Sequence, residues 1–284
     1  MANEPYMRAK AIKDSFSPFG RIAWHFEYRA DDHDDGEKTF LGETGRFNGQ
    51  DIIDIIVRHP ATANFICTRL FQFFVADEVD EEEKQVIEEL KESYFDSKYS
   101  IRSVMRTLFN TTYFKSDKAR FARVKSPVEL VVGAVRMAGS CLNPTPAMSA
   151  QLDSTAFMGQ GLLRPPGVEG WHEGQEWIES GSLVERVNFA AKELGDVNQP
   201  GIQEIINRIA KSNGDPLTPE ELVDRCLDLL GPIVVSDGTR TSLAGYAARR
   251  GQLDLSNHQK GDESEKRVGE VLSLIASTPE YQLA

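Results

Sequence analysis

Hydrophobic positions recur every three to four residues along most of this 284-residue chain, which is the spacing of one face of an α-helix. Segments with this period occupy residues 49–59, 61–76, 80–95, 101–109, 126–139, 182–194, 202–211, 218–231 and 264–277. The pattern predicts a mainly α fold of about nine to ten helices, built as a multi-helix orthogonal bundle.

Two of these segments have the clearest hydrophobic faces. Residues 61–76 predict a core helix, and its stacked side chains are Ile66, Leu70, Phe73 and Phe74. Residues 80–95 begin with acids, which the helix dipole favours in a first turn. The side chains of this helix that we expect to point inward are Val86, Ile87, Leu90 and Tyr94.

Two helix starts are marked by the same capping signal. Ser126 precedes Pro127 at the first helical position, and Glu129 stands third for a capping box. Thr218, Pro219 and Glu221 repeat this arrangement. Since Ser or Thr caps exposed backbone N–H groups and Pro fits the first turn, both sites predict helix N-termini.

The period changes to two only near the N-terminus. Residues 21–29 alternate aromatic or aliphatic with polar side chains, and residues 38–42 are short and β-prone. Alternation with aromatic enrichment is typical of a half-buried strand. We therefore predict one small β-hairpin from these two segments, with the acidic run between them at its tip.

One long segment has little period of either kind. Residues 139–181 are rich in Gly and Pro, and loops of that length are uncommon in compact domains unless they have a role. We expect a single domain over residues 1–284. Its possible sub-lobes are residues 17–140 and 178–284, joined by the loop 141–177.

Composition narrows the function classes. The chain has 32 Lys and Arg against 44 Asp and Glu, a net charge of −12, which disfavours non-specific binding to nucleic acid and to anionic membranes. No apolar run approaches the ~20 residues of a membrane span, and the first residues lack the apolar core of a signal peptide. Cys67, Cys141 and Cys226 are far apart, and Cys67 and Cys226 fall on apolar helical faces. The three are expected to be buried free thiols.

The acidic run contains the densest set of potential metal ligands. Asp31, His33, Asp35 and Gly36 match the first half of a calcium loop, but His33 replaces an Asp or Asn and Gly42 stands where a bidentate Glu is needed. An EF-hand is excluded. A different divalent-cation site formed by Asp31, His33, Asp34 and Asp35 is one hypothesis, and a solvated acidic turn is the other.

The loop ending the Gly- and Pro-rich segment offers two further candidates. His172 and Glu176 form a near match to the zinc-protease motif, but a second imidazole is missing. Trp171 and Trp177 could stack on a sugar, or they could fix the loop to the protein core, which is the commoner role of large aromatics at a loop–helix junction. The usual nucleophile and phosphate-binding motifs do not occur.

Four ordered blocks suggest a family. They read "HDDGEKTFLG", "NGQDIIDIIVRHPATANFICTRLFQFFVAD", "VKSPVELVVGAVRMAG" and "GQGLLRPPGVEGWHEGQEWI". From roughly residue 17 onward the chain resembles the bacterial family called domain of unknown function 1800. The resemblance implies no established activity. It implies an extracytoplasmic setting, longer members with a further N-terminal helical region, and a possible partner from a phosphatase-like or sulfatase-like family.

These observations lead to one hypothesis for a binding pocket and to three hypotheses for the function. If the first and last of the four blocks lie together, a polar pocket with aromatic walls would be lined by His33, Asp34, Lys38, Arg164, Trp171 and Trp177. The leading function is a helical scaffold or partner-binding module of an exported bacterial system. The alternatives are a metal-dependent or hydrolase-like enzyme at the His33, Asp34 and Asp35 loop, and a carbohydrate-binding module that uses Trp171 and Trp177.

Overall fold

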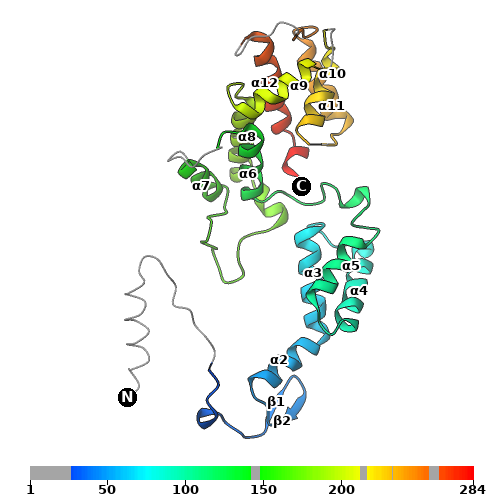
Figure 1. Cartoon of the computed structure of the whole chain (residues 1–284), viewed down its shortest axis with the longest axis vertical. Coiled ribbons are helices and arrows are strands. Elements are labelled where there is room, and N and C mark those ends of the chain that lie inside the picture. Colours follow the sequence, from blue (N-terminus) through cyan, green and yellow to red (C-terminus); the bar gives the residue numbers. More distant parts are fainter. Residues whose placement is uncertain (1–26, 142–147, 212–215, 232, 256–261) are drawn as a thin grey trace. The chain divides into compact units, whose positions relative to one another are not determined.

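Helices dominate the computed structural model, which describes residues 27–141, 148–211, 216–231, 233–255 and 262–284 (Figure 1). Its elements there are eleven α-helices, four short 3-10 helices and one two-stranded antiparallel sheet. The mainly α class with one small hairpin near the N-terminus is therefore confirmed. The chain divides into two compact units, residues 1–59 and residues 60–284.

The first unit contains the hairpin. A 3-10 helix, η1 (Ala30–Asp32), precedes strands β1 (Lys38–Phe40) and β2 (Glu43–Gly45), and α2 (Gly49–Arg58) follows. Lys38 pairs with Gly45 across the hairpin. Asn48 caps α2 through a capping box with Asp51.

The predicted strand within residues 38–42 is confirmed, and its partner across the hairpin is residues 43–45. Residues 21–26 of the expected first strand lie outside the described residues, and residues 27–29 form no strand. Leu41 and Gly42 both have positive φ, 49° and 85°, which is the backbone of a tight two-residue hairpin turn. This turn lets β1 pair with the residues directly after it.

The second unit opens with three helices, α3 (Pro60–Phe74), α4 (Glu81–Asp96) and α5 (Ile101–Asn110), in which α4 packs against both of the others. The four side chains expected to point inward from α4 are all buried, as predicted. The expected stripe of α3 was wrong. The buried face of α3 consists of Ala63, Cys67 and Phe71, and Phe73 and Phe74 are exposed.

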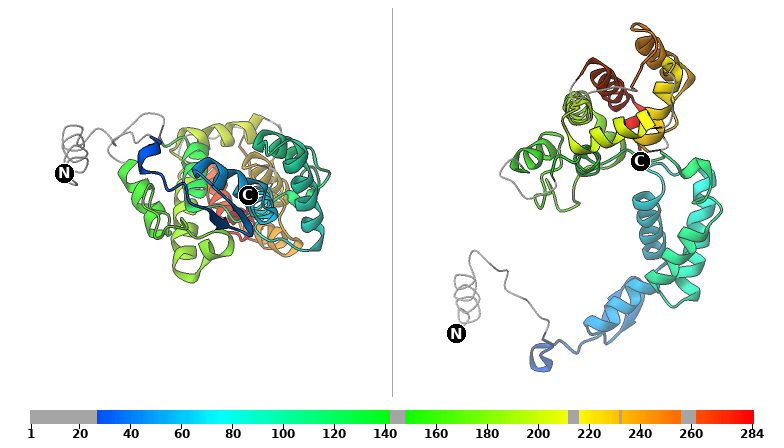
Figure 2. Two further views of the ribbon diagram at one scale, coloured as in Figure 1. Left: turned by 90° about the horizontal axis from the view of Figure 1, so that it is seen from below. Right: turned by 45° about the horizontal axis from the view of Figure 1, so that its top comes forward.

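The remaining helices surround the main hydrophobic core. They are α6 (Pro127–Ala138), α7 (Met148–Phe157), α8 (Ser180–Gly195), α9 (Pro200–Lys211), α10 (Pro219–Leu229), α11 (Asp237–Ala248) and α12 (Glu263–Ala276). Helix α8 packs along α12 and against α6 (Figures 1 and 2). Both predicted capping boxes, at Ser126 and Thr218, are present. The sequence did not predict α7 or α11, whose apolar residues do not form a continuous stripe.

The C-terminal segment is attached to the strand-like segment before α6. Val124 and Leu283 form an isolated antiparallel bridge. The N–H of Ala284 donates to the carbonyl of Arg123 at 2.7 Å, and the N–H of Lys125 donates to the carbonyl of Gln282 at 2.8 Å. These bonds place the end of the chain, including the 3-10 helix η4 (Glu280–Gln282), beside the N-terminus of α6.

Candidate functional site

The acidic run 31–36 forms a locally neutralised turn in the first unit. Arg29 pairs with Asp32 at 2.9 Å, and His33 Nδ1 lies 2.9 Å from Asp35 Oδ1. Asp34 Oδ1 accepts the N–H of Gly36 at 2.8 Å. This hydrogen bond, and then Lys38, hold the pKa of the Asp34 carboxyl below its ordinary value. Asp31 and Asp34 are largely exposed to solvent, so the turn is a solvated one whose carboxylates pair with neighbouring bases.

The metal hypothesis at Asp31, His33, Asp34 and Asp35 gains no support from this geometry. Across the described part of the chain, no group of three or more His, Cys, Asp or Glu side chains is arranged to hold a metal ion. The possible divalent cation stays a prediction.

The two tryptophans of the second unit belong to the packing of their own loop. Trp177 is 5% exposed and lies against Gly159. Trp171 is partly buried, and its indole N–H donates to the carbonyl of Gly161 at 3.1 Å. Trp177 therefore has no open ring face for a sugar, and both side chains stabilise the fold of residues 159–178.

The same loop is fixed to α3 and to the segment that connects α3 to α4. Glu173 pairs with Arg69 at 2.8 Å, and Gln175 Nε2 donates to Glu78 Oε1 at 3.1 Å. Gly174 has φ of 59°, and an added Cβ there would lie 3.3 Å from Asp77 Cγ. Arg164 is exposed. The loop thus covers one side of Asp77, a residue that the sequence did not single out.

Asp77 lines a cleft of about 340 Å³. Its Oδ2 accepts the N–H of Val124 at 2.6 Å, and its own N–H donates to the carbonyl of Ala122 at 3.2 Å. Burial raises the pKa of the Asp77 carboxyl despite the Val124 hydrogen bond. A carboxyl that keeps its proton to higher pH can donate a proton, but this single group does not define a reaction.

The other wall of this cleft is acidic. Glu78, Asp80 and Glu83 line it beside Tyr113, whose hydroxyl donates to Glu83 Oε1. Burial raises the pKa of the Tyr113 hydroxyl, and Asp80 adds to the effect. The cleft therefore favours cationic or hydrogen-bond-donating groups over anions.

A chain of phenylalanine rings lies on the surface where α3 and α5 end. Ring centroids are 4.7 Å apart between Phe73 and Phe74, 5.4 Å between Phe74 and Phe109, and 5.1 Å between Phe109 and Phe114. All three pairs are edge-on, which is a favoured aromatic geometry. Phe73 is 65% exposed, and Phe65, two turns earlier on α3, is 63% exposed.

Basic side chains accompany these rings. On α5, Arg102, Arg106 and Phe109 are spaced by four and three residues and so share one face. Within the described residues, neither Arg102 nor Arg106 has an ion-pair partner. We call the set Phe65, Phe73, Phe74, Phe109, Arg102 and Arg106 the phenylalanine surface.

One sequence signal marks this surface. No Asp or Glu occurs between Asp54 and Asp77, or between Asp96 and Asp117, although acids outnumber bases in the whole chain. These two acid-free segments contain α3 and α5. Periodicity alone missed the surface because it counts an exposed Phe as a core residue.

The six residues of the pocket predicted from the sequence fall in different units. His33, Asp34 and Lys38 belong to residues 1–59, and Arg164, Trp171 and Trp177 belong to residues 60–284. Their convergence stays a prediction.

Comparison with known proteins adds one match. The model of a family described as a protein of unknown function (DUF1800) matches residues 20–283. No curated protein and no solved structure matches the chain. Of the helices in the described segments, none has the length and apolar character to cross a membrane.

Proposed function

Because the chain belongs to the family called domain of unknown function 1800, whose description assigns no activity, we propose from its geometry that it is a partner-binding helical module. Its binding site is the phenylalanine surface, and its partner is an acidic, amphipathic protein segment. The observation that carries this proposal is the chain of exposed, mutually packed phenylalanine rings on two helices that lack acidic residues.

The aromatic rings supply the apolar part of the site. Exposed apolar side chains scattered singly are ordinary on protein surfaces, but contiguous ones mark binding sites. Phe73, Phe74 and Phe109 are contiguous through ring contacts. Each ring is held by its neighbour, so a partner would lose little additional side-chain freedom on binding, and rigid aromatics of this kind often dominate interface energies.

The positive charges of the phenylalanine surface favour a partner with negative charges. Arg102 and Arg106 stand one turn apart beside Phe109, without carboxylates on their own helix to neutralise them. A partner segment with carboxylates at the same spacing as its apolar anchors would complement both parts of the surface. Because the whole chain has a net charge of −12, an extended anionic membrane would also face its acidic residues, whereas a short acidic segment needs to contact only the acid-free surface. A protein segment is therefore favoured over lipid.

The proposal can be tested with a phage-displayed library of amphipathic helices that differ in charge, selected on the full chain. We expect acidic members to be enriched. In fluorescence anisotropy, the double variant Phe73→Ser/Phe109→Ser should bind the selected peptide at least about tenfold more weakly, as for an interface hot spot. The charge reversal Arg102→Glu/Arg106→Glu should weaken binding further and remove the preference for acidic peptides.

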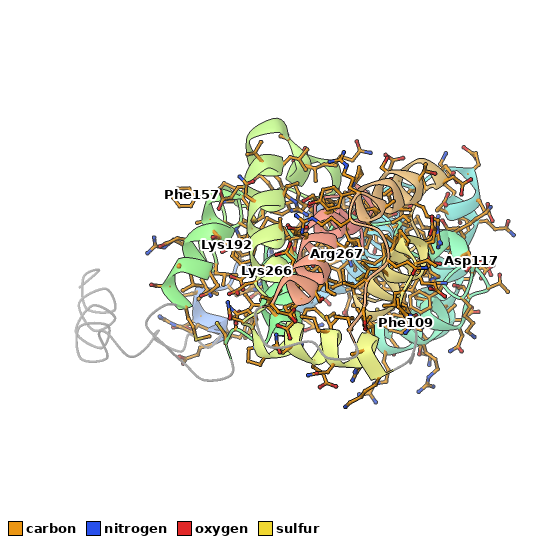
Figure 3. All side chains as sticks on the ribbon, turned by 90° about the horizontal axis from the view of Figure 1, so that it is seen from above. Phe109, Asp117, Phe157, Lys192, Lys266 and Arg267 are labelled. Carbon is orange, nitrogen blue, oxygen red and sulfur yellow. The ribbon has the colours of Figure 1, made fainter. Side chains whose placement is uncertain are left out.

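A matched control is available on α7. Phe157 is 78% exposed and lies on the opposite side of the view from Phe109 (Figure 3), so Phe157→Ser should leave binding unchanged. Equal binding by the Phe73/Phe109 variant, or tighter binding to phosphatidylglycerol vesicles than to any peptide, would contradict the proposal. The phosphatase-like or sulfatase-like protein expected from the family resemblance is one partner to assay in the same way.

A further inference from the structure

A buried guanidinium lies beneath the C-terminal segment of the second unit. Arg186 of α8 is 0% exposed. Its Nε donates to Gln282 Oε1 at 2.9 Å, and its Nη2 donates to the carbonyl of Lys125 at 2.7 Å. Its Nη1 is buried and has no hydrogen-bond partner among the described residues. Since Arg stays charged at neutral pH, positive charge is buried here with one donor group unused.

A second cation lies beside this guanidinium. Lys125 donates from Nζ to the carbonyl of Tyr281 at 2.7 Å and lies 4.2 Å from the centroid of its ring. Burial, and then the charge of Arg186, lower the pKa of the Lys125 amine to about 8. In the part of the chain that is described, neither cation forms an ion pair with a carboxylate.

The nearest carboxylate that acts on both cations is already engaged. Glu129 accepts the N–H of Ser126 at 2.7 Å in the capping box of α6, and it pairs with Arg123 at 3.3 Å. Glu129 therefore stabilises the two positive charges by longer-range attraction, but it does not accept a hydrogen bond from Arg186 Nη1.

The donors without a hydrogen-bond partner indicate what kind of ligand the cluster of Arg186, Lys125 and Gln282 would bind. Three buried side-chain polar atoms lack a hydrogen-bond partner within the described residues, and two of them, Arg186 Nη1 and Gln282 Nε2, are N–H donors of this one cluster. Leaving a buried charged donor without an acceptor is costly. A group that only accepts hydrogen bonds and carries negative charge would satisfy the cluster.

We propose that Arg186 and Lys125, with Gln282, form an anion-binding site that takes a small oxyanion, a phosphate or a carboxylate, beneath the C-terminal segment. The anion would accept a charge-assisted hydrogen bond from Arg186 Nη1 and neutralise Lys125. Lys125 is partly exposed, so one side of the cluster meets solvent. The site uses none of the residues of the phenylalanine surface and does not depend on the function proposed for that surface.

Thermal unfolding and titration calorimetry of the full chain test the site. The probes are sodium phosphate and sodium acetate at low millimolar concentration, compared with sodium chloride at equal ionic strength. We expect at least one oxyanion to raise the Tm of the wild type in a saturable way, since a ligand that binds only the native state stabilises it. The response to each probe distinguishes a phosphate site from a carboxylate site.

Two variants and a control make the test specific. Gln282→Glu places a carboxylate beside the guanidinium, so it should raise the Tm without added anion and abolish the oxyanion response. Lys125→Met removes one cation and should weaken oxyanion binding about tenfold, the loss of one charge-assisted hydrogen bond. Gln85→Glu makes the same charge change at an exposed position of α4 and should keep the wild-type response.

Two results would overturn the site. If phosphate and acetate act on the wild type only as chloride does, the unused donors bind water. If the oxyanion response persists unchanged in Lys125→Met, the anion binds elsewhere. The second result decides the question even if Gln282→Glu does not fold.

Discussion

Lys125 makes the stability of the protein depend on pH in a predictable direction. Its pKa is about 8 in the folded chain against an ordinary 10.5. Between these pH values the unfolded state binds more protons than the folded state, so the free energy of unfolding rises as pH rises from 8 to 10.5. At about 1.4 kcal/mol for each pKa unit, the rise is at most about 3.5 kcal/mol.

Lys125→Met should remove this rise and stabilise the protein below pH 8. The measurement is urea unfolding at pH 7, 8, 9 and 10 in dilute chloride buffer, so that no oxyanion neutralises the amine. Lys192→Met, which changes an exposed lysine of α8, should keep the wild-type pH dependence. Parallel curves for the wild type and Lys125→Met would contradict the burial of this charge.

The roles of some residues could be predicted from their sequence neighbours, and the roles of others could not. Ser126 and Thr218 were identified from sequence because a capping box uses only residues three apart. Cys67, Cys141 and Cys226 were expected to be buried free thiols. All three are free, Cys67 and Cys226 are buried, and Cys141 is only partly buried. Phe73 was assigned to the core because an aromatic at helical spacing usually belongs there. Only tertiary packing, in which α3 contacts α4 and buries Ala63, Cys67 and Phe71, decides that its ring faces outward.

At the scale of elements, two glycines of neighbouring helices have opposite roles. Helices α6 and α9 meet so closely at Gly201 that an added Cβ would overlap the carbonyl oxygen of Met137 and lie 2.9 Å from the carbonyl carbon of Ala138. Gly133, on the exposed side of α6, has no atom within 4 Å of an added Cβ. One glycine is required for packing, and the other only weakens its helix.

We expect Gly201→Ala to lower the free energy of unfolding by about 1–3 kcal/mol, the usual range for overpacking. Gly133→Ala should raise it by about 0.5–1 kcal/mol, since Ala has the higher helix propensity. Chemical denaturation of the two variants measures both values. A loss of stability in Gly133→Ala, or none in Gly201→Ala, would contradict the described packing of α6 on α9.

Element prediction was accurate where the apolar period was strong and inaccurate where pairing or tertiary contacts decide. Helix α4 has an uninterrupted apolar stripe and was predicted with its buried face. Helices α7 and α11 contain many small and polar residues, so they form because neighbouring helices cover them. The partner of β1 depended on the turn at Leu41 and Gly42, since either flanking segment could have paired with it.

For the whole molecule, the candidate sites come from contacts between distant segments. Arg186 and Gln282 are separated by 96 positions, and the phenylalanine surface joins the ends of two helices. Neither association can be predicted from the spacing of residues within one segment. The residues selected from the sequence, such as Trp177 and Asp34, therefore belong to clusters of residues that are close together along the chain. The division of the chain into two units likewise reflects how contacts are distributed rather than any compositional boundary.

The distribution of contacts along the chain predicts that two deletions, of residues 1–59 and of residues 280–284, lower the Tm by different amounts. The main hydrophobic cluster lies entirely between Leu130 and Tyr281, so a fragment of residues 60–284 should unfold cooperatively, with a Tm within a few degrees of the full chain. Deleting only residues 280–284 should lower the Tm more. That deletion removes the acceptor of Arg186 Nε and the backbone bonds to Arg123 and Lys125, and it leaves the Arg186 guanidinium with only the carbonyl of Lys125 as a hydrogen-bond partner among the described residues.

Calorimetric scans of the full chain and the two truncated forms measure this order directly. The expected order holds because the cost of a deletion depends on the buried groups it uncovers, not on its length. If removal of residues 1–59 abolishes the cooperative transition, the first unit is part of one folding domain over residues 1–284. In that case its hairpin and α2 contribute to the stability of the helical core.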